Sequence, residues 1–300
     1  MSFSNKLFFT ASFIAILALN SCKNDENSSA DLSDQTASQE ANPKRTFNNA
    51  FDGKLYSVPS ALQTIVLINS LAIPFDSTFL FIRTNNNPYP NYTSQAFHLG
   101  FYYVDIAYMA IYDQKGECLK YLEPMKELAI NLETTTIFSP FFTENLRSNI
   151  EKKDSLLMLF SSHFSEFDYY LKEHDKKNIS SLILAGGWLK SMYIVSQVYK
   201  KNKNNLLLQH LGHQKHNLET VIQLIEKHNT NGQNDDYLKH FTELNELYEK
   251  VNLHYEYMAP ITDKENRVTT ISKGINAELS EELSNKIIEC ISKTYSKIAN

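Results

Sequence analysis

The pattern of apolar and polar positions beyond residue 51 is helical almost throughout, with apolar side chains recurring every three or four residues. The clearest stripe consists of Tyr237, Phe241, Leu244, Tyr248, Val251, Tyr255 and Met258. Such a stripe packs one helix face against neighbouring helices and is typical of a bundle or a helical-hairpin array. The polar residues 234–236 before it and Pro260 after it predict the two ends of that helix.

Other segments extend this helical pattern along the chain. Amphipathic stripes run through residues 156–171 and 207–225, whereas residues 96–111 and 181–199 are apolar on nearly every side, which predicts central helices surrounded by others. Further helices are expected at residues 59–71, 118–132, 140–150 and 277–298, and only residues 78–83 show a brief strand-like alternation. We therefore predict an all-α domain, either a multi-helix bundle or an irregular helical-hairpin array, with about eight to nine helices.

The N-terminal segment differs from this domain. Residues 7–19 are an apolar run that follows a short positive segment and is too short to cross a membrane, as in a secretory signal peptide. The sequence Leu19-Asn20-Ser21-Cys22 resembles the bacterial lipobox, which directs lipidation and cleavage at the cysteine, although Asn20 replaces the usual small residue. A plain secretory signal with a coincidental cysteine is the alternative interpretation.

The predicted organisation is a lipoprotein signal peptide over residues 1–21, a lipidated Cys22 with a flexible polar tether over 22–50, and one folded domain over 51–300. The diacylglyceryl and N-acyl (palmitate) chains of bacterial lipoproteins together give effectively permanent anchoring. Residues 23–26, Lys-Asn-Asp-Glu, resemble the signal that sends Bacteroidota lipoproteins to the cell surface. We expect a lipid anchor in the outer membrane. The folded domain is then either on the cell surface or on the periplasmic face of that membrane.

Composition limits the kinds of partner that the protein is expected to have. With 42% hydrophobic residues, the 300-residue chain can bury a sizeable core. Its net charge of -5 is spread along the chain, so no clustered basic surface predicts a nucleic-acid partner. Besides Cys22 the chain has Cys118 and Cys290, and either a disulfide between them or two buried thiols fits an exported protein.

The best polar candidate lies in the apolar segment 96–111, where His98, Tyr102 and Asp105 share one helix face. A buried carboxylate is costly unless it is hydrogen-bonded, so Asp105 needs partners nearby. These residues either form a satisfied polar cluster that fixes helix packing or contact a small ligand in a pocket that Trp188 would help to wall.

Gly186 and Gly187 interrupt an apolar helix, in which each glycine costs about 1 kcal/mol relative to alanine. Close approach of a second helix is the favoured explanation, and a binding surface walled by Trp188 is the alternative. The two glycines do not belong to a phosphate-loop pattern, and no strand is expected before them, so we do not predict a phosphate-binding loop here.

His210, His213 and His216 have the three-residue spacing of metal ligands on a helix. The apolar stripe through residues 207–225, however, places His213 and His216 on the opposite, solvent-facing side and His210 at its border. Exposed histidines without supporting carboxylates rarely hold a metal, so we expect neither a metal nor a cofactor.

Three segments carry a resemblance to a known group of proteins. Residues 52–67, 99–108 (LGFYYVDIAY) and 185–193 (AGGWLKSMY) resemble uncharacterised Bacteroidota outer-membrane lipoproteins with an all-helical domain. The resemblance covers most of the mature chain and implies a fold and a location. It implies no activity that could be transferred to this chain.

The sequence contains no recognisable nucleophile elbow, zincin helix, zinc-knuckle spacing or calcium loop, which disfavours the common enzymes. We therefore expect a membrane-tethered, non-enzymatic domain that binds a protein partner or a small ligand. The alternatives are an enzyme with a central pocket around Asp105 and His98, and a purely structural envelope component. The sequence leaves the oligomeric state open.

Overall fold

The computed structural model describes residues 47–51, 54–58, 61–82, 89–134, 138, 140–149, 152–257, 259–263, 268–270 and 273–299, all within the unit Ala41–Asn300. The predicted signal peptide, the predicted lipidation site Cys22 and most of the predicted tether lie outside these residues. Strand β1 (Phe47–Phe51) occupies the last residues of the predicted tether. Among the described residues, regular structure is thus already present before the expected domain boundary at residue 51.

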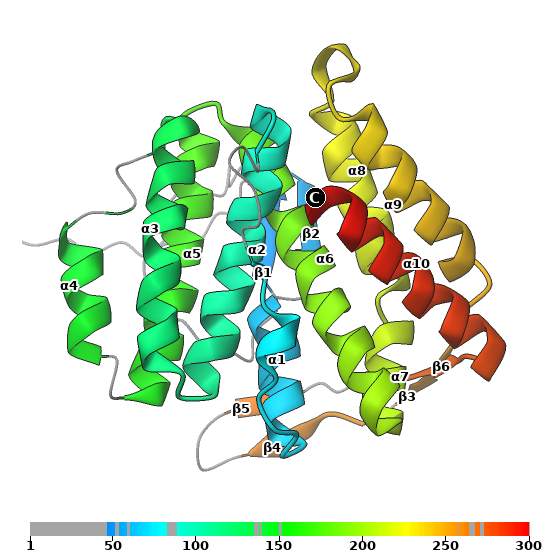
Figure 1. Ribbon diagram of the computed structural model, residues 1–300. Coiled ribbons are helices and arrows are strands. Elements are labelled where there is room, and N and C mark those ends of the chain that lie inside the picture. Colours follow the sequence, from blue (N-terminus) through cyan, green and yellow to red (C-terminus); the bar gives the residue numbers. More distant parts are fainter. Residues whose placement is uncertain are drawn as a thin grey trace, which may run out of the picture. The chain divides into compact units, whose positions relative to one another are not determined.

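Helices make up most of the described structure (Figure 1). They are α1 (Ala61–Ser70), α2 (Tyr92–Ile111), α3 (Lys115–Asn131), α4 (Pro140–Asn149), α5 (Lys153–Glu173), α6 (Lys177–Asn202), α7 (Asn205–Gly212), α8 (Lys215–Lys227), α9 (Asp235–Tyr248) and α10 (Glu281–Ala299). Two short 3-10 turns, η1 (Ser77–Phe79) and η3 (Thr230–Gly232), lie between them. The predicted all-α class is confirmed.

α2 and α6 cross at the centre of the fold, and nearly all of their side chains are buried. Glycines let the two backbones touch: a Cβ atom on Gly100 would lie 2.3 Å from the Ile183 carbonyl oxygen, and one on Gly186 would lie 2.2 Å from that of Phe97. The expectation of a close helix approach at Gly186 is thus confirmed. Among the described helices, only α6 is long and apolar enough to cross a membrane, and 89% of its apolar window is buried inside the protein.

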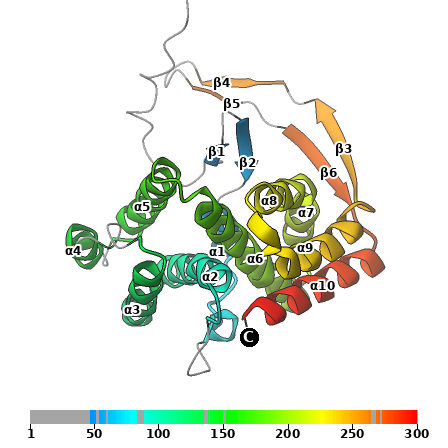
Figure 2. The same cartoon turned by 90° about the horizontal axis from the view of Figure 1, so that it is seen from above.

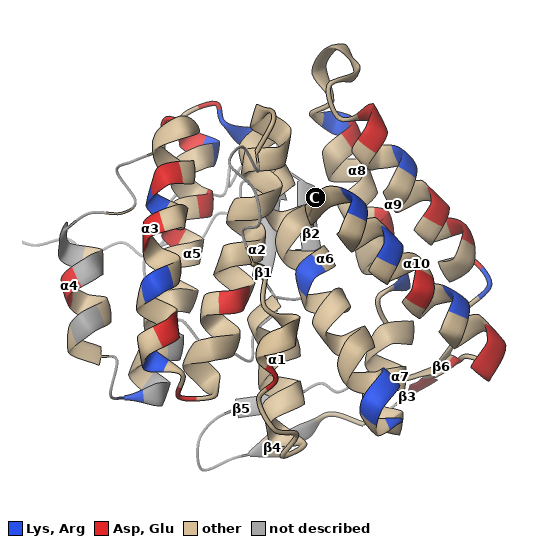
Figure 3. Cartoon of the chain, viewed as in Figure 1, with Lys and Arg blue, Asp and Glu red and all other residues tan. Residues whose placement is uncertain are grey.

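Other helices pack on both sides of this central pair (Figure 2). α3 and α5 contact one side, and α4 packs on α5. α7, α8 and α10 contact α6 on the other side, α9 packs against both α8 and α10, and α1 contacts both central helices. Charged residues are frequent on outer helices such as α3, α9 and α10 but sparse on α2 and α6 (Figure 3). This distribution agrees with the central position that the apolar pattern predicts for the latter two.

The described strands form three antiparallel pairs. They are β1 with β2 (Lys54–Val58), β3 (Asn252–Tyr257) with β6 (Lys273–Glu278), and β4 (Ile261–Asp263) with β5 (Val268–Thr270). The prediction of one helix extending to Met258 is wrong, because α9 ends at Tyr248 and β3 follows. Leu253, Tyr255 and Tyr257 alternate with polar residues, and this strand period coincides with the last steps of the helical stripe.

Three further expectations need correction. The helix predicted over 277–298 begins at Glu281, because residues 273–278 pair with β3. The stripe over 207–225 is divided between α7 and α8, and α7 ends at Gly212, where a side chain would strike Ala277. The first residues of the predicted strand at 78–83 lie instead in η1, where the Thr78 N–H donates to the Asp76 carboxylate as an N-cap.

Candidate functional site

α2 brings the predicted residues His98, Tyr102 and Asp105 to one face, and Phe81 lies against all three. The Phe81 N–H donates to Asp105 Oδ2 at 2.8 Å. The Phe81 ring centroid lies 5.0 Å from that of His98 and 5.5 Å from that of Tyr102. The three predicted residues are thus neighbours, but they lie in the buried core. Their assignment to a ligand site stays a prediction.

Asp105 forms an ion pair with Lys190, which the sequence analysis did not single out. Asp105 Oδ1 lies 3.2 Å from Lys190 Nζ, and neither side chain has exposed surface. Lys190 also donates to the Phe79 carbonyl oxygen at 2.6 Å and to the Tyr295 hydroxyl at 2.9 Å. Lys190 thus uses two of its three N–H donors in hydrogen bonds, whereas its contact with Asp105 is an ion pair in which Oδ1 accepts no hydrogen bond. We call Asp105, Lys190, Tyr295 and the Phe79 carbonyl the polar junction.

Burial dominates the electrostatics of the polar junction. It raises the pKa of Asp105 to about 6, although the Lys190 charge and the Phe81 N–H lower that value. It also lowers the pKa of Lys190, against the opposing effect of the Asp105 charge. Each charged group is therefore held in the interior by the other, and removal of either one would leave an uncompensated charge or donor.

His98 and Tyr102 have partners of their own beside the polar junction. His98 Nδ1 lies 2.7 Å from the Ser94 carbonyl oxygen. Burial lowers the pKa of His98 to about 4, whereas hydrogen bonds with the backbone of Ser94 and Ala299 raise it, so the imidazole is neutral at neutral pH. The Tyr102 hydroxyl lies 2.9 Å from that of Tyr89. These contacts are those of a polar cluster that fixes helix packing.

Trp188, the fourth predicted residue, belongs to a different part of the interior. It precedes Lys190 by two positions on α6, which places the two side chains on opposite helix faces. Trp188 Nε1 donates to Gln214 Oε1 at 3.1 Å, and its ring lies 6.1 Å from that of Phe241. Trp188 therefore packs towards α8 and α9, and the predicted site that joined it to Asp105 is not assembled by these contacts.

The three predicted histidines also separate. His210 Nε2 lies 3.0 Å from Thr64 Oγ1, and burial lowers the His210 pKa to about 4. His213 was expected to face solvent, but its Nε2 lies 2.8 Å from the Ile275 carbonyl oxygen of β6. His216 is exposed as expected. Among the described residues, no group of three His, Cys, Asp or Glu side chains could hold a metal ion.

The two cysteines of the described structure do not form a disulfide. Cys118 in α3 is buried, Cys290 in α10 is partly buried, and both thiols are free. Burial raises the pKa of Cys118 to about 12, so that thiol stays protonated and unreactive at neutral pH. The sequence left a disulfide or two thiols as alternatives, and the structure has two thiols.

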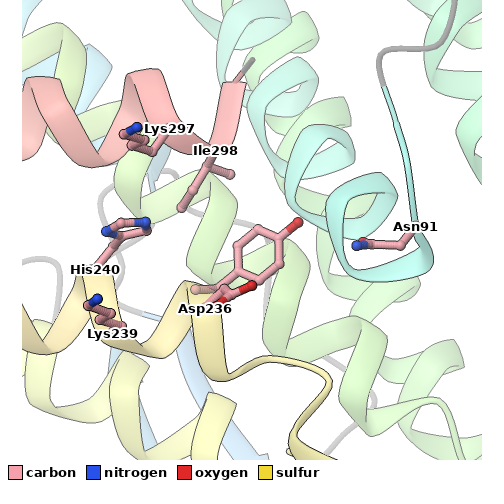
Figure 4. Close-up of a pocket in the computed structure, with 7 residues that line it drawn as sticks. Asn91, Asp236, Lys239, His240, Lys297 and Ile298 are labelled. Atoms are coloured by element: carbon pink, nitrogen blue, oxygen red, sulfur yellow. The ribbon is translucent and has the colours of Figure 1, made fainter.

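A surface pocket lies where α9 and α10 meet the start of α2. It has a volume of about 350 Å³ and is lined by Asn91, Asp236, Tyr237, Lys239, His240, Lys297 and Ile298. Figure 4 shows Lys297 and Ile298 on α10, Asp236, Lys239 and His240 on α9, and Asn91 on the segment that leads into α2. We call this the α9–α10 pocket. Sequence analysis did not identify it, because its residues come from three distant parts of the chain.

The α9–α10 pocket has more positive than negative groups. Lys239 and Lys297 face one carboxylate in the lining, that of Asp236. The nearby Glu243 is already engaged, since its Oε2 lies 3.7 Å from Lys293 Nζ and 3.9 Å from His240 Nδ1. The balance of charge in the pocket therefore favours an anion.

The α9–α10 pocket adjoins the predicted residue His98. The Ser94 hydroxyl lies 3.2 Å from His98 Nδ1. The Ser94 side chain also interacts with the pocket residue Tyr237. Burial raises the pKa of Tyr237, and the contact with Ser94 opposes that effect. His98 is thus one side chain removed from the pocket. It supports the wall of the pocket through Ser94 and does not line it.

Comparison with known proteins adds no further information about this site: no family model, curated protein or solved structure matches the chain. The resemblance to Bacteroidota lipoproteins therefore stays a prediction, and the function must be argued from the geometry of the chain itself.

Proposed function

We propose that this protein is an envelope lipoprotein, tethered to the outer membrane through Cys22, whose helical domain binds a small ligand without catalysing a reaction. One observation supports the binding role above the others. The buried charges of Asp105 and Lys190 form an ion pair with each other at the polar junction. Lys239 and Lys297, in contrast, line the α9–α10 pocket and have no hydrogen-bond or ion-pair partner among the described residues.

An enzyme centred on Asp105 and His98 is less well supported. A catalytic acid or base must come within about 3 Å of the proton that it transfers. Asp105 has no exposed surface, and His98 is buried and bonded to Ser94. A substrate could reach them only after Phe81 and its backbone hydrogen bond to Asp105 were displaced.

The lipid anchor is tested with the variant Cys22→Ala in the native host. We expect the wild-type protein to incorporate radiolabelled palmitate and to sediment with the outer membrane, and we expect the variant to lose the label. Cys290→Ala is the matched control and should keep the label, because its thiol lies within the folded domain. Label is the decisive readout, since an uncleaved signal peptide could itself retain the variant in a membrane. An unlabelled wild-type protein would refute the anchor.

The binding role is tested by native mass spectrometry of the full-length chain, purified in detergent from its host. We expect a non-covalent adduct of small-molecule mass that disappears on denaturation. If only the mass of the lipidated polypeptide is found, even after incubation with a metabolite extract of the host, the binding role fails. That outcome would favour the structural alternative.

A further inference from the structure

Three helix ends meet at the α9–α10 pocket, and their charges are not balanced in the same way. The N-terminal end of a helix carries partial positive charge, and its C-terminal end carries partial negative charge. α9 begins with Asp235 and Asp236, which offset its positive end, and α10 has Lys297 in its last turn, whose full positive charge exceeds the partial negative charge of that end. α2 has no acidic residue in its first turn. Its positive end is therefore uncompensated beside Asn91, which caps it and lines the pocket.

The two lysines of the pocket are exposed and lack the carboxylate partner that several other lysines of the described structure have. Lys172, Lys190 and Lys201 each reach a carboxylate. Lys239 and Lys297 have no such partner among the described residues, although they lie on two neighbouring helices. These two ammonium groups, which line the same pocket as the α2 cap Asn91, provide the charge and the donors that an anionic group requires.

The size and the remaining lining of the pocket restrict the ligand further. A volume of about 350 Å³ suits a small molecule, since ligand pockets range from about 300 to about 1,000 Å³. The buried side chain of Ile298 and the ring of Tyr237 give apolar contact, while the Asp236 carboxylate can accept from hydroxyl groups. A compact, hydroxylated molecule with one anionic end matches this lining.

From these observations we propose that the α9–α10 pocket binds a small soluble organic anion through a phosphate or carboxylate group held between Lys239 and Lys297. This inference rests on the proposed binding function and names the ligand class for it. The α2 N-terminus adds positive potential, and Asp236 restricts binding to anions that also carry a hydrogen-bond donor.

The test is isothermal titration calorimetry on the full-length chain in detergent at low ionic strength. The probes are glycerol 3-phosphate and glycerate as anions, glycerol as the neutral control, and phosphatidylglycerol in mixed micelles of the same detergent as a lipid source of the same phosphate chemistry. The test variant is Lys239→Gln with Lys297→Gln. The control variant is Lys250→Gln with Lys286→Gln, which removes the same charge from the turn after α9 and from α10, outside the pocket lining.

We expect at least one soluble anion to bind the wild type and the control variant. Its affinity for the test variant should be lower by a factor of about ten or more. Equal binding to the two variants would show a non-specific charge effect and overturn the proposal. If phosphatidylglycerol is the only probe that binds, the proposal of a soluble ligand is wrong. If glycerol is the only probe that binds, the proposal of an anionic ligand is wrong. A neutral adduct in native mass spectrometry would leave the binding function intact and refute only this inference.

Discussion

Replacement of Lys190 by methionine is expected to lower the free energy of unfolding by about 3–5 kcal/mol, the cost of breaking a buried ion pair on one side. Methionine retains most of the apolar stem and removes only the ammonium. Asp105 then keeps the Phe81 N–H at 2.8 Å but loses the ammonium at 3.2 Å. The Phe79 carbonyl and the Tyr295 hydroxyl lose the donor that they share. Each unsatisfied buried group costs about 1–3 kcal/mol, which agrees with the total.

The measurement is urea-induced unfolding of the full-length chain, followed by far-ultraviolet circular dichroism at neutral pH. The double variant Lys190→Met with Asp105→Leu removes both charges, so it should recover much of the stability that the single variant loses. Lys250→Met, at an exposed position, should change stability by no more than about 0.5 kcal/mol. If Lys190→Met costs less than about 1 kcal/mol, or if the double variant is the least stable of all, the argument from the buried pair is refuted.

Three further predictions concern the same interior. Histidine in an unfolded chain has a pKa of about 6.5, whereas burial lowers the pKa of folded His98 to about 4. Between these values the unfolded chain binds more protons than the folded one, so the free energy of unfolding rises with pH. His98→Gln should flatten that rise when it is measured by urea unfolding. Gly100→Ala places a methyl group against the Ile183 carbonyl oxygen, and we expect a loss of about 1–3 kcal/mol. Gly116→Ala, where a Cβ meets nothing within 4 Å, should be neutral or stabilising; equal losses at both positions would contradict the close crossing. Tyr295→Phe should cost about 1 kcal/mol by thermal unfolding, through the lost hydrogen bond to Lys190, and an unchanged stability would argue against that bond.

The helical class and the two central helices could be predicted because burial on all sides leaves a clear apolar signature. Residues 96–111 and 181–199 have few polar side chains, and the structure places them in α2 and α6. The requirement that Asp105 have a partner was also sound, because a buried carboxylate demands one. A single lysine inside the otherwise apolar segment 181–199 was the available clue to that partner.

Tertiary contacts account for what could not be predicted. β3 and β6 pair only through tertiary contacts, and Tyr255 belongs both to the helical stripe that runs on to Met258 and to the strand alternation of Leu253, Tyr255 and Tyr257. His213 escaped prediction because its acceptor, the Ile275 carbonyl, belongs to that same β-ribbon. The α9–α10 pocket depends on three helix ends that meet only in the folded chain. No local period encodes such a meeting.

The position of Tyr295 in the polar junction has a consequence for when the chain can fold. Lys190 joins acceptors that lie at positions 79, 105 and 295. Of the described helices, α10 is the last to leave the ribosome, and it covers parts of α6 and α9. Until α10 packs, Lys190 lacks the Tyr295 hydroxyl as an acceptor, and the surfaces of α6 and α9 that α10 covers stay open to solvent. A chain that lacks α10 would therefore expose apolar surface beside an unsatisfied ammonium group and become a target for proteases and chaperones.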